Sequence, residues 1–179
     1  MKTDVREFVS HRFDEAHSAT PYLDYPHWNT VSNGRAQPAA ALGYREAAAG
    51  PLFLEAYLSR PIEGVVSEAF GRDVARSSIV EIGCLASLPS AALVKLWSQT
   101  ATALASSHQI VVATLTRPLR SMFARLALPV VELADAKREL VHDPDAWGSY
   151  YDMDPVVCAG DIAAGIAALA RFTDRAVRS

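Results

Sequence analysis

From residue 78 onward, short apolar runs rich in β-branched residues alternate with segments of helical periodicity. The strand-type runs cover residues 78–85, 110–115, 129–133 and 155–159, and helical stripes separate the first three, at 91–106 and after Pro118. Strands of one sheet that a helix connects run parallel, with a right-handed crossover. The alternation therefore predicts an α/β fold with parallel pairing in the second half of the chain.

The first half of the chain predicts a helix followed by an antiparallel hairpin. Residues 5–19 repeat apolar side chains at helical spacing. The sequence Ser32-Asn33-Gly34-Arg35 is a strong turn signal, and a strand-type run at 39–44 follows it. We expect this strand to pair antiparallel with the one before the turn.

Capping residues mark the ends of the remaining helices. Residues 51–59 begin a helical region, and Pro61 and Gly71 are placed to start and end the next helix. Ser90 is placed to cap the helix at 91–106, and Asp161 is more typical of the N-cap of a terminal helix than of a catalytic acid.

These elements predict one domain over residues 1–179, with a mixed sheet and helices on both faces. The terminal helix occupies 163–179. By analogy of element order alone, this is also the order of the Gcn5-related N-acetyltransferase (GNAT) fold.

Composition excludes several classes of function. The net charge is −3 and the 17 basic residues are scattered, which argues against a nucleic-acid surface. Cys84, Cys158 and the five histidines have no spacing typical of a metal site, so no metal is predicted. The longest nearly apolar stretch, 162–170, is shorter than the roughly 20 residues that a membrane-spanning helix needs. With no signal-type N-terminus, we expect a cytoplasmic protein.

The strand at 78–85 carries three candidate functional residues. Glu81 interrupts an apolar run, so it is either a general base with a raised pKa or a solvent-facing or ion-paired glutamate. Gly83 within a strand indicates a bulge or the close approach of another group. Cys84 is a candidate nucleophile, although a free cysteine is more often a buried apolar side chain.

Two arginines follow the strand at 110–115. Arg117 and Arg120 lie where ligands of α/β sheets bind, at the carboxyl end of a strand, and either can hold a phosphate or carboxylate. The other interpretation is a pair of solvated arginines on a first helical turn.

Aromatic and acidic residues gather between positions 146 and 155. This string contains Trp147, Tyr150, Tyr151, Asp152 and Asp154, between segments rich in Ala, Leu and Val. The rings either plug one end of the sheet or form part of a site. The string has no clean strand or helix period, which leaves both interpretations open.

Several ordered segments together resemble the thermostable hemolysin family. They are Pro51 to Leu58, Pro61-Ile62-Glu63, Phe70-Gly71-Arg72, Val80 to Leu88, Thr116 to Leu128 and Trp147 to Asp161. The resemblance covers about residues 40–162. One departure is visible, because the family commonly has Asn after the Glu-Ile/Val-Gly triplet and this chain has Cys84.

The family looks similar to GNAT-type acyltransferases and, more distantly, to acyl-homoserine-lactone synthases. This resemblance implies an acyl donor on coenzyme A or on the phosphopantetheine of an acyl carrier protein, a small amine acceptor, and no covalently bound cofactor. An N-acyltransferase of specialised or lipid metabolite biosynthesis is therefore the leading hypothesis. The segment before the helix at 91–106 has no glycines for a phosphate loop, which favours a carrier-protein donor.

Under this hypothesis each candidate residue has a role. The thioester lies between the strands at 79–85 and 110–115, and Glu81 takes a proton from the amine. A backbone N–H near Gly83, Cys84 or Leu85 stabilises the oxyanion, and Tyr150 or Tyr151 protonates the leaving thiolate. The remaining predicted substrate contacts are Arg117, Arg120, Trp147 and Asp152.

Two alternatives stay open. The family name suggests a membrane-active hemolysin, for which the helix at 162–177 is the nearest amphipathic candidate. The other alternative is a GNAT-like binding partner without catalysis in a biosynthetic complex. The sequence leaves the oligomeric state undetermined.

Overall fold

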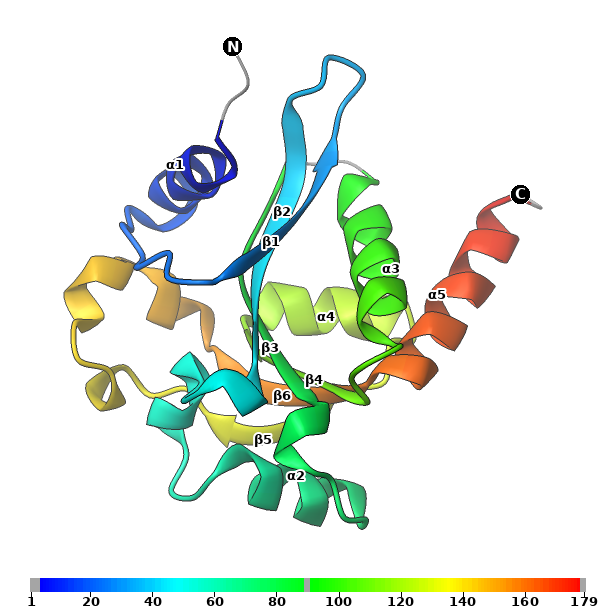
Figure 1. Cartoon of the computed structure of the whole chain (residues 1–179). Helices are drawn as coiled ribbons and strands as arrows, with labels where there is room; N and C mark the ends of the chain where they lie inside the picture. Colours follow the sequence, from blue (N-terminus) through cyan, green and yellow to red (C-terminus); the bar gives the residue numbers. More distant parts are fainter. Residues whose placement is uncertain (1–3, 89–90, 178–179) are drawn as a thin grey trace.

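A six-stranded mixed sheet, in the order β1-β2-β3-β4-β6-β5, forms the centre of the molecule (Figure 1). The computed structural model describes residues 4–88 and 91–177. The strands are β1 (His27–Ser32), β2 (Pro38–Glu46), β3 (Ile79–Ser87), β4 (Ile110–Leu115), β5 (Val131–Asp135) and β6 (Val156–Asp161). The helices are α1 (Val5–His17), α2 (Ile62–Phe70), α3 (Ala92–Leu104), α4 (Arg117–Arg125) and α5 (Ile162–Val177).

Helices cover both faces of the sheet, as the sequence predicts. Side-chain alternation along β2 turns Ala41 towards α1 and its neighbours Ala40 and Leu42 towards α3. The cluster around α2 packs on the same face as α1, against Ile79 of β3, whereas α3, α4 and α5 lie on the opposite face (Figure 1). Each sheet face therefore has its own apolar core.

Local signals explain where these elements begin and end. The Asp4 side chain accepts a hydrogen bond from the Arg6 amide and caps α1. In the hairpin turn, the Asn33 side chain accepts from the amides of Arg35 and Gln37. Gly71 ends α2 in the left-handed conformation at φ 63°. The hairpin and the end of α2 at Gly71 confirm the sequence predictions.

Of the two other predicted caps, Asp161 and Ser90, the structure describes only Asp161. Asp161 precedes α5 and its Oδ1 accepts from the Ala164 amide at 3.0 Å, as an N-cap does. Ser90 lies outside the described residues, and α3 begins at Ala92 after Ala91. Across residues 4–88 and 91–177, α5 included, no helix is both long and apolar enough to cross a membrane.

The predicted parallel pairing is confirmed for β3 and β4 and is wrong for β4 and β5, which do not pair. Only β3 and β4 pair parallel, and β6 pairs antiparallel with both β4 and β5. Strands β4 and β5, which α4 connects, do run in the same direction, because both are antiparallel to β6. However, β6 occupies the position between them and runs the opposite way.

Strands β3 and β4 separate towards their carboxyl ends. Their pairing extends from Ile79 opposite Ile110 to Ile82 opposite Ala113. Among the described residues, no pair joins the two strands beyond Ile82, although β3 continues to Ser87 and β4 to Leu115. The divergence opens the sheet interior next to Glu81.

A half-buried ion cluster holds the segment that faces this opening. The guanidinium of Arg76 donates to Glu55 at 2.7 and 2.8 Å, to Glu63 at 2.8 Å, and to the carbonyls of Ala47 and Gly50. Glu55 also accepts from the amide of Leu52, just before the 3₁₀ helix η2 (Phe53–Tyr57), and from the amide of Ile62, the first residue of α2. The hydrogen bonds from Arg76 lower the pKa of Glu55 to about 2.

The low pKa of Glu55 makes stability depend on acid. Because the folded pKa lies below the unfolded value, its stabilisation is present above about pH 4.5 and is lost as pH falls towards 2. We expect Glu55→Gln to lower the free energy of unfolding by about 2 to 3 kcal/mol at pH 7, and by much less near pH 2. Urea unfolding at both pH values measures this.

Glu68→Gln is the matched control, because Glu68 pairs with Arg60 at the surface with 67% of its side chain exposed. It should cost less than about 1 kcal/mol at either pH. An equal effect of both substitutions would contradict the role assigned to the Arg76 cluster.

Candidate active site

A cavity of about 70 Å³ lies where β3 and β4 separate. Its floor comes from residues 81–85 of β3 and from Ala113, Thr114 and Leu115 at the end of β4. Most of its remaining wall is aromatic. The rings are Phe13, Tyr22, Tyr25, Phe53, Tyr57, Trp147, Tyr150, Trp97 and Phe123.

Glu81 is buried in this cavity, with 2% of the residue exposed. Its Oε2 accepts from the Phe53 amide and its Oε1 from the Leu54 amide, both at 2.9 Å. These amides open η2, so the carboxylate caps that helix across the chain. Glu81 is thus neither solvent-facing nor one half of an ion pair.

Burial raises the pKa of Glu81 to about 7, even though the two amide donors oppose the shift. Each carboxylate oxygen keeps a further acceptor position beyond its one amide. A carboxyl group that titrates near neutrality and faces a cavity is suited to accept a proton from a bound molecule.

The close approach predicted at Gly83 is made by Tyr25. Gly83 pairs with Gly43 across β2 and β3, and the Tyr25 ring lies over both. A Cβ on Gly83 would lie 2.0 Å from Tyr25 Oη, and a Cβ on Gly43 would lie 2.6 Å from Tyr25 Cβ. Tyr25 was not identified from the sequence. Two paired glycines leave room for a large side chain, but their pairing becomes known only from the register of β2 with β3.

A β-bulge follows Gly83 and also confirms an expectation. Between two successive pairings, β3 has one residue more than β2, and Cys84 adopts φ 49°. The left-handed region costs a non-glycine residue roughly 1 kcal/mol. Burial raises the pKa of the Cys84 thiol to about 12, so it is protonated at neutral pH and poorly suited to be a nucleophile.

The two tyrosines of the aromatic string point to different places. Tyr150 lines the cavity, and its hydroxyl donates to the Thr114 carbonyl at 3.4 Å. Tyr151 does not line it, and its hydroxyl lies 2.7 Å from that of Tyr57, which does. Burial raises the pKa of Tyr57 and of Tyr150, so both phenols keep their protons. Tyr57 was missed, because nothing local distinguishes it from a core tyrosine.

The aromatic string packs against the end of the sheet and also lines the cavity. Trp147 packs against Phe53 and Tyr150 with ring centroids 5.4 and 5.2 Å apart, and it lines the cavity. The backbone of the string is tied to the end of α1, since the Ser149 amide donates to the His17 carbonyl at 2.9 Å. The string closes one end of the sheet and forms a cavity wall at the same time.

The remaining predicted contacts lie elsewhere. Arg120 binds Asp154 at 2.9 Å and Glu132 at 3.1 Å, and the largely exposed Arg117 binds Asp154 at 3.3 Å. Arg120, followed by Arg117, lowers the pKa of Asp154. Asp152 is exposed. The cavity thus brings together Glu81, Gly83, Cys84, Leu85, Trp147 and Tyr150, while substrate contacts by Arg117, Arg120 and Asp152 stay predictions.

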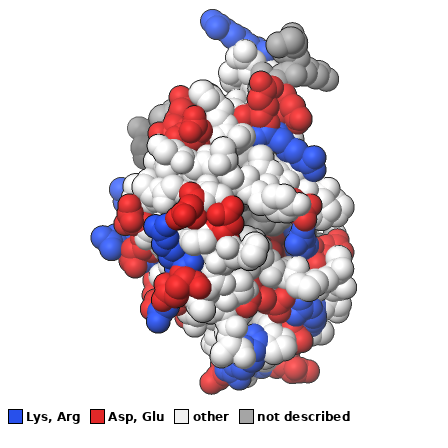
Figure 2. Space-filling model, turned by 90° about the vertical axis from the view of Figure 1, so that its left-hand side faces the viewer, with Lys and Arg blue, Asp and Glu red and all other residues white. Residues whose placement is uncertain are grey.

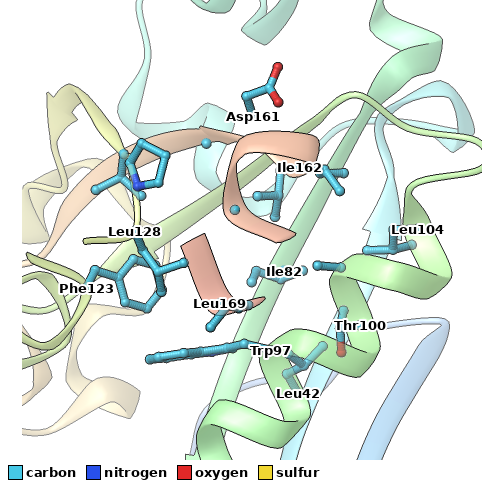
Figure 3. A pocket seen from close by; sticks show the side chains of 16 residues that line it. Leu42, Ile82, Trp97, Thr100, Leu104, Phe123, Leu128, Asp161, Ile162 and Leu169 are labelled. Atoms are coloured by element: carbon cyan, nitrogen blue, oxygen red, sulfur yellow. The ribbon is translucent and has the colours of Figure 1, made fainter. Parts of the chain in front are cut away.

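A second, apolar cavity of about 90 Å³ adjoins the first (Figure 3). Leu42, Ile82, Trp97 and Phe123 line both, so they form a shared wall. Behind this wall the lining is almost entirely aliphatic, and in Figure 3 the carboxylate of Asp161 points away from it. The cavity that contains Glu81 therefore adjoins a more apolar compartment across this wall.

The outer surface beside α1 carries mixed charge. Acidic and basic side chains are interspersed there with broad uncharged areas (Figure 2). Within the described part of the chain, no cluster of three or more His, Cys, Asp or Glu side chains is arranged to hold a metal ion.

One protein-family model matches almost the whole chain. A model described as thermostable hemolysin matches residues 1–166. The chain belongs to this family. A comparison with curated proteins finds no match. Cys84 adopts the left-handed backbone of the bulge, a conformation that Asn tolerates better than other non-glycine residues.

This thermostable hemolysin family member has the fold of several solved synthases. BjaI, a CoA-dependent acyl-homoserine lactone synthase with SAM and isopentyl-CoA, superposes with TM-score 0.61 at 14% identity, over 95% of this chain and 80% of that one. TofI, in a ternary complex with an inhibitor and MTA, gives 0.59 at 13% identity over 92% and 88%. FeeM, an N-acyl amino acid synthase from uncultured soil microbes, gives 0.56 at 14% over 88% of each chain. At these identities the likeness establishes the fold.

The contact between Tyr25 and Gly83 generates a stability prediction. Gly83→Ala places a Cβ 2.0 Å from Oη and 2.6 Å from Cζ of the buried Tyr25, so we expect a loss of about 1 to 3 kcal/mol. Urea unfolding measures it. Adding Tyr25→Ala removes the clash, so the alanine at 83 should cost less in that background.

Gly64→Ala in α2 is the control, because nothing lies within 4 Å of the added Cβ. It should leave stability unchanged or raise it by about 0.5 to 1 kcal/mol. If Gly83→Ala behaved in the same way, the close packing described for Tyr25 would be wrong.

Proposed function

We propose that the protein is an N-acyltransferase, which moves an acyl group from a thioester to the nitrogen of an amine. The observation that carries the proposal is the buried carboxyl of Glu81 beside the point where β3 and β4 separate. The shared fold supports it, since solved structures of this fold include acyl-homoserine lactone synthases and an N-acyl amino acid synthase.

In the proposed reaction the thioester carbonyl lies over the bulge of β3. The amine nitrogen bonds to the carbonyl carbon, and Glu81 takes the proton that nitrogen loses, directly or through water. A backbone N–H at Gly83, Cys84 or Leu85 stabilises the oxyanion. The carbon–sulfur bond then breaks, and the Tyr150 phenol protonates the leaving thiolate. Tyr151 acts through its hydrogen bond to Tyr57, which lines the cavity.

We propose that the acyl chain extends from the cavity at Glu81, between the side chains that line both cavities, into the apolar cavity. That compartment offers aliphatic surface from α3, α5 and β4, where a hydrocarbon tail loses contact with water. The donor is an acyl carrier protein or coenzyme A thioester, and the reaction is proposed to serve specialised or lipid metabolite biosynthesis in the cytoplasm. MesI and BjaI are described as CoA-dependent, so both donor types belong in the assay.

The pKa of Glu81 predicts the pH profile. The base is the ionised carboxylate, so kcat/KM should rise with pH through about 7 and then level off. Glu81→Gln should lower kcat/KM by roughly 10²- to 10⁴-fold and abolish that rise. Both are measured by mass spectrometry of products formed from acyl-CoA and acyl-carrier-protein donors with mixed amines.

Glu81→Gln also weakens the cap on η2, so circular dichroism must first establish that the variant is folded. A folded variant that kept the wild-type rate and pH profile would exclude Glu81 as the base. Leakage of lipid vesicles caused by the pure wild-type protein, with no acyl transfer, would favour the lytic alternative instead.

The apolar cavity predicts a limit on acyl chain length. Gly165 of α5 lines the cavity, and nothing lies within 4 Å of a Cβ built on it. Gly165→Leu should fill the space and lower kcat/KM for the longest accepted acyl donor by about tenfold or more, while shorter donors are affected less. Rates with a series of donors of increasing chain length test this.

Gly64→Leu is the matched control, since Gly64 is also a helical glycine with open space at its Cβ but lies in α2. It should leave the chain-length profile unchanged. The same profile for wild type and Gly165→Leu would place the acyl chain elsewhere.

A further inference from the structure

The reacting end of the acceptor must enter the interior of the protein. Glu81 is 2% exposed, and its carboxylate is fixed by the amides of Phe53 and Leu54 rather than free to swing outward. An amine that delivers a proton to this carboxylate therefore brings the substituents of its own α-carbon into the cavity with it.

The charges around that position are unusual for a site that takes an amino acid. Among the described residues that line the cavity, Glu81 is the only one with a formally charged side chain, and the others are aromatic, aliphatic or uncharged polar. The Arg45 guanidinium lies 5.9 Å from the centroid of the Tyr25 ring and is bound by Asp24 and the Pro51 carbonyl. His17 meets the edge of Tyr150, and burial lowers its pKa, which favours the neutral imidazole.

We infer that the acceptor is a primary amine with no carboxylate on the carbon that bears nitrogen, and this inference rests on the proposed function. An α-carboxylate in the cavity would lose its hydration with no cationic side chain in the lining to pair with it, and Glu81 would repel it. Aromatic walls favour the opposite class of molecule. Ring faces attract ammonium groups and stack on arylalkyl groups, so arylalkylamines and diamines match the lining.

Matched pairs of acceptors test the inference. Each pair has the same side chain with and without the carboxylate: tyramine and tyrosine, tryptamine and tryptophan, cadaverine and lysine. The wild-type protein is given one acyl donor of each type, and products are quantified by mass spectrometry. We expect at least one amine to exceed its amino acid by about 100-fold or more in kcat/KM.

A charge change at the mouth of the cavity provides a second readout. Tyr22 lines the cavity and is 78% exposed, so its substitution should not disturb folding. Tyr22→Arg supplies a cation and should reduce the preference for the amine by about tenfold. Tyr22→Gln removes the ring without adding charge and is the control, which should not shift the preference towards the amino acid.

The outcomes separate the two proposals. Acylation of amino acids at rates equal to or above those of their amines would overturn this inference and leave the N-acyltransferase intact. Equal shifts from Tyr22→Arg and Tyr22→Gln would also count against it, because the discrimination would not be electrostatic. If neither donor acylated any member of any pair, the proposed function would fail, and the inference would fall with it.

Discussion

The contact between the Glu81 carboxylate and the amides of Phe53 and Leu54 organises the site. It joins the central strand β3 to η2, which the Arg76 cluster holds from the other side. Removing the acid would leave two buried amides without an acceptor, and removing η2 would leave a buried carboxylate without donors. The structural role and the proposed catalytic role thus fall on one side chain, and its burial inside an apolar strand raises its pKa to about 7.

Most elements of the fold were predictable because their signals are local. Apolar spacing identified α1 and α3, turn and cap residues located the hairpin and the end of α2, and an unbroken apolar run gave β4. The place of β6 was not predictable in this way. The direction and neighbours of a strand depend on which sheet edge is free when it arrives, and no residue within 155–161 encodes that edge.

The candidate site likewise contains residues that a local signal identifies and residues that only the fold brings together. Glu81 and Gly83 were identifiable because each is an exception to the composition of its own strand. Tyr25 and Tyr57 come from segments distant in sequence, and only the register of β2 with β3 and the position of η2 bring them to the cavity. Tyr150 and Tyr151 are adjacent and chemically identical, so the sequence alone left their assignment open, and the hydrogen bond between Tyr151 and Tyr57 separates them.

The insertion of β6 between β4 and β5 has a consequence for biosynthesis. During translation β4 emerges with one edge unpaired, and that edge stays available until residues 156–161 have left the ribosome. Trp147 and Tyr150, which line the cavity, are also synthesised late, shortly before β6. A nascent chain stopped before this point therefore exposes a central apolar strand. Chaperones bind such strands, and other unfolded chains aggregate with them. A truncation that removes β6 should therefore impair folding of the whole sheet, and any loss of activity would follow from that.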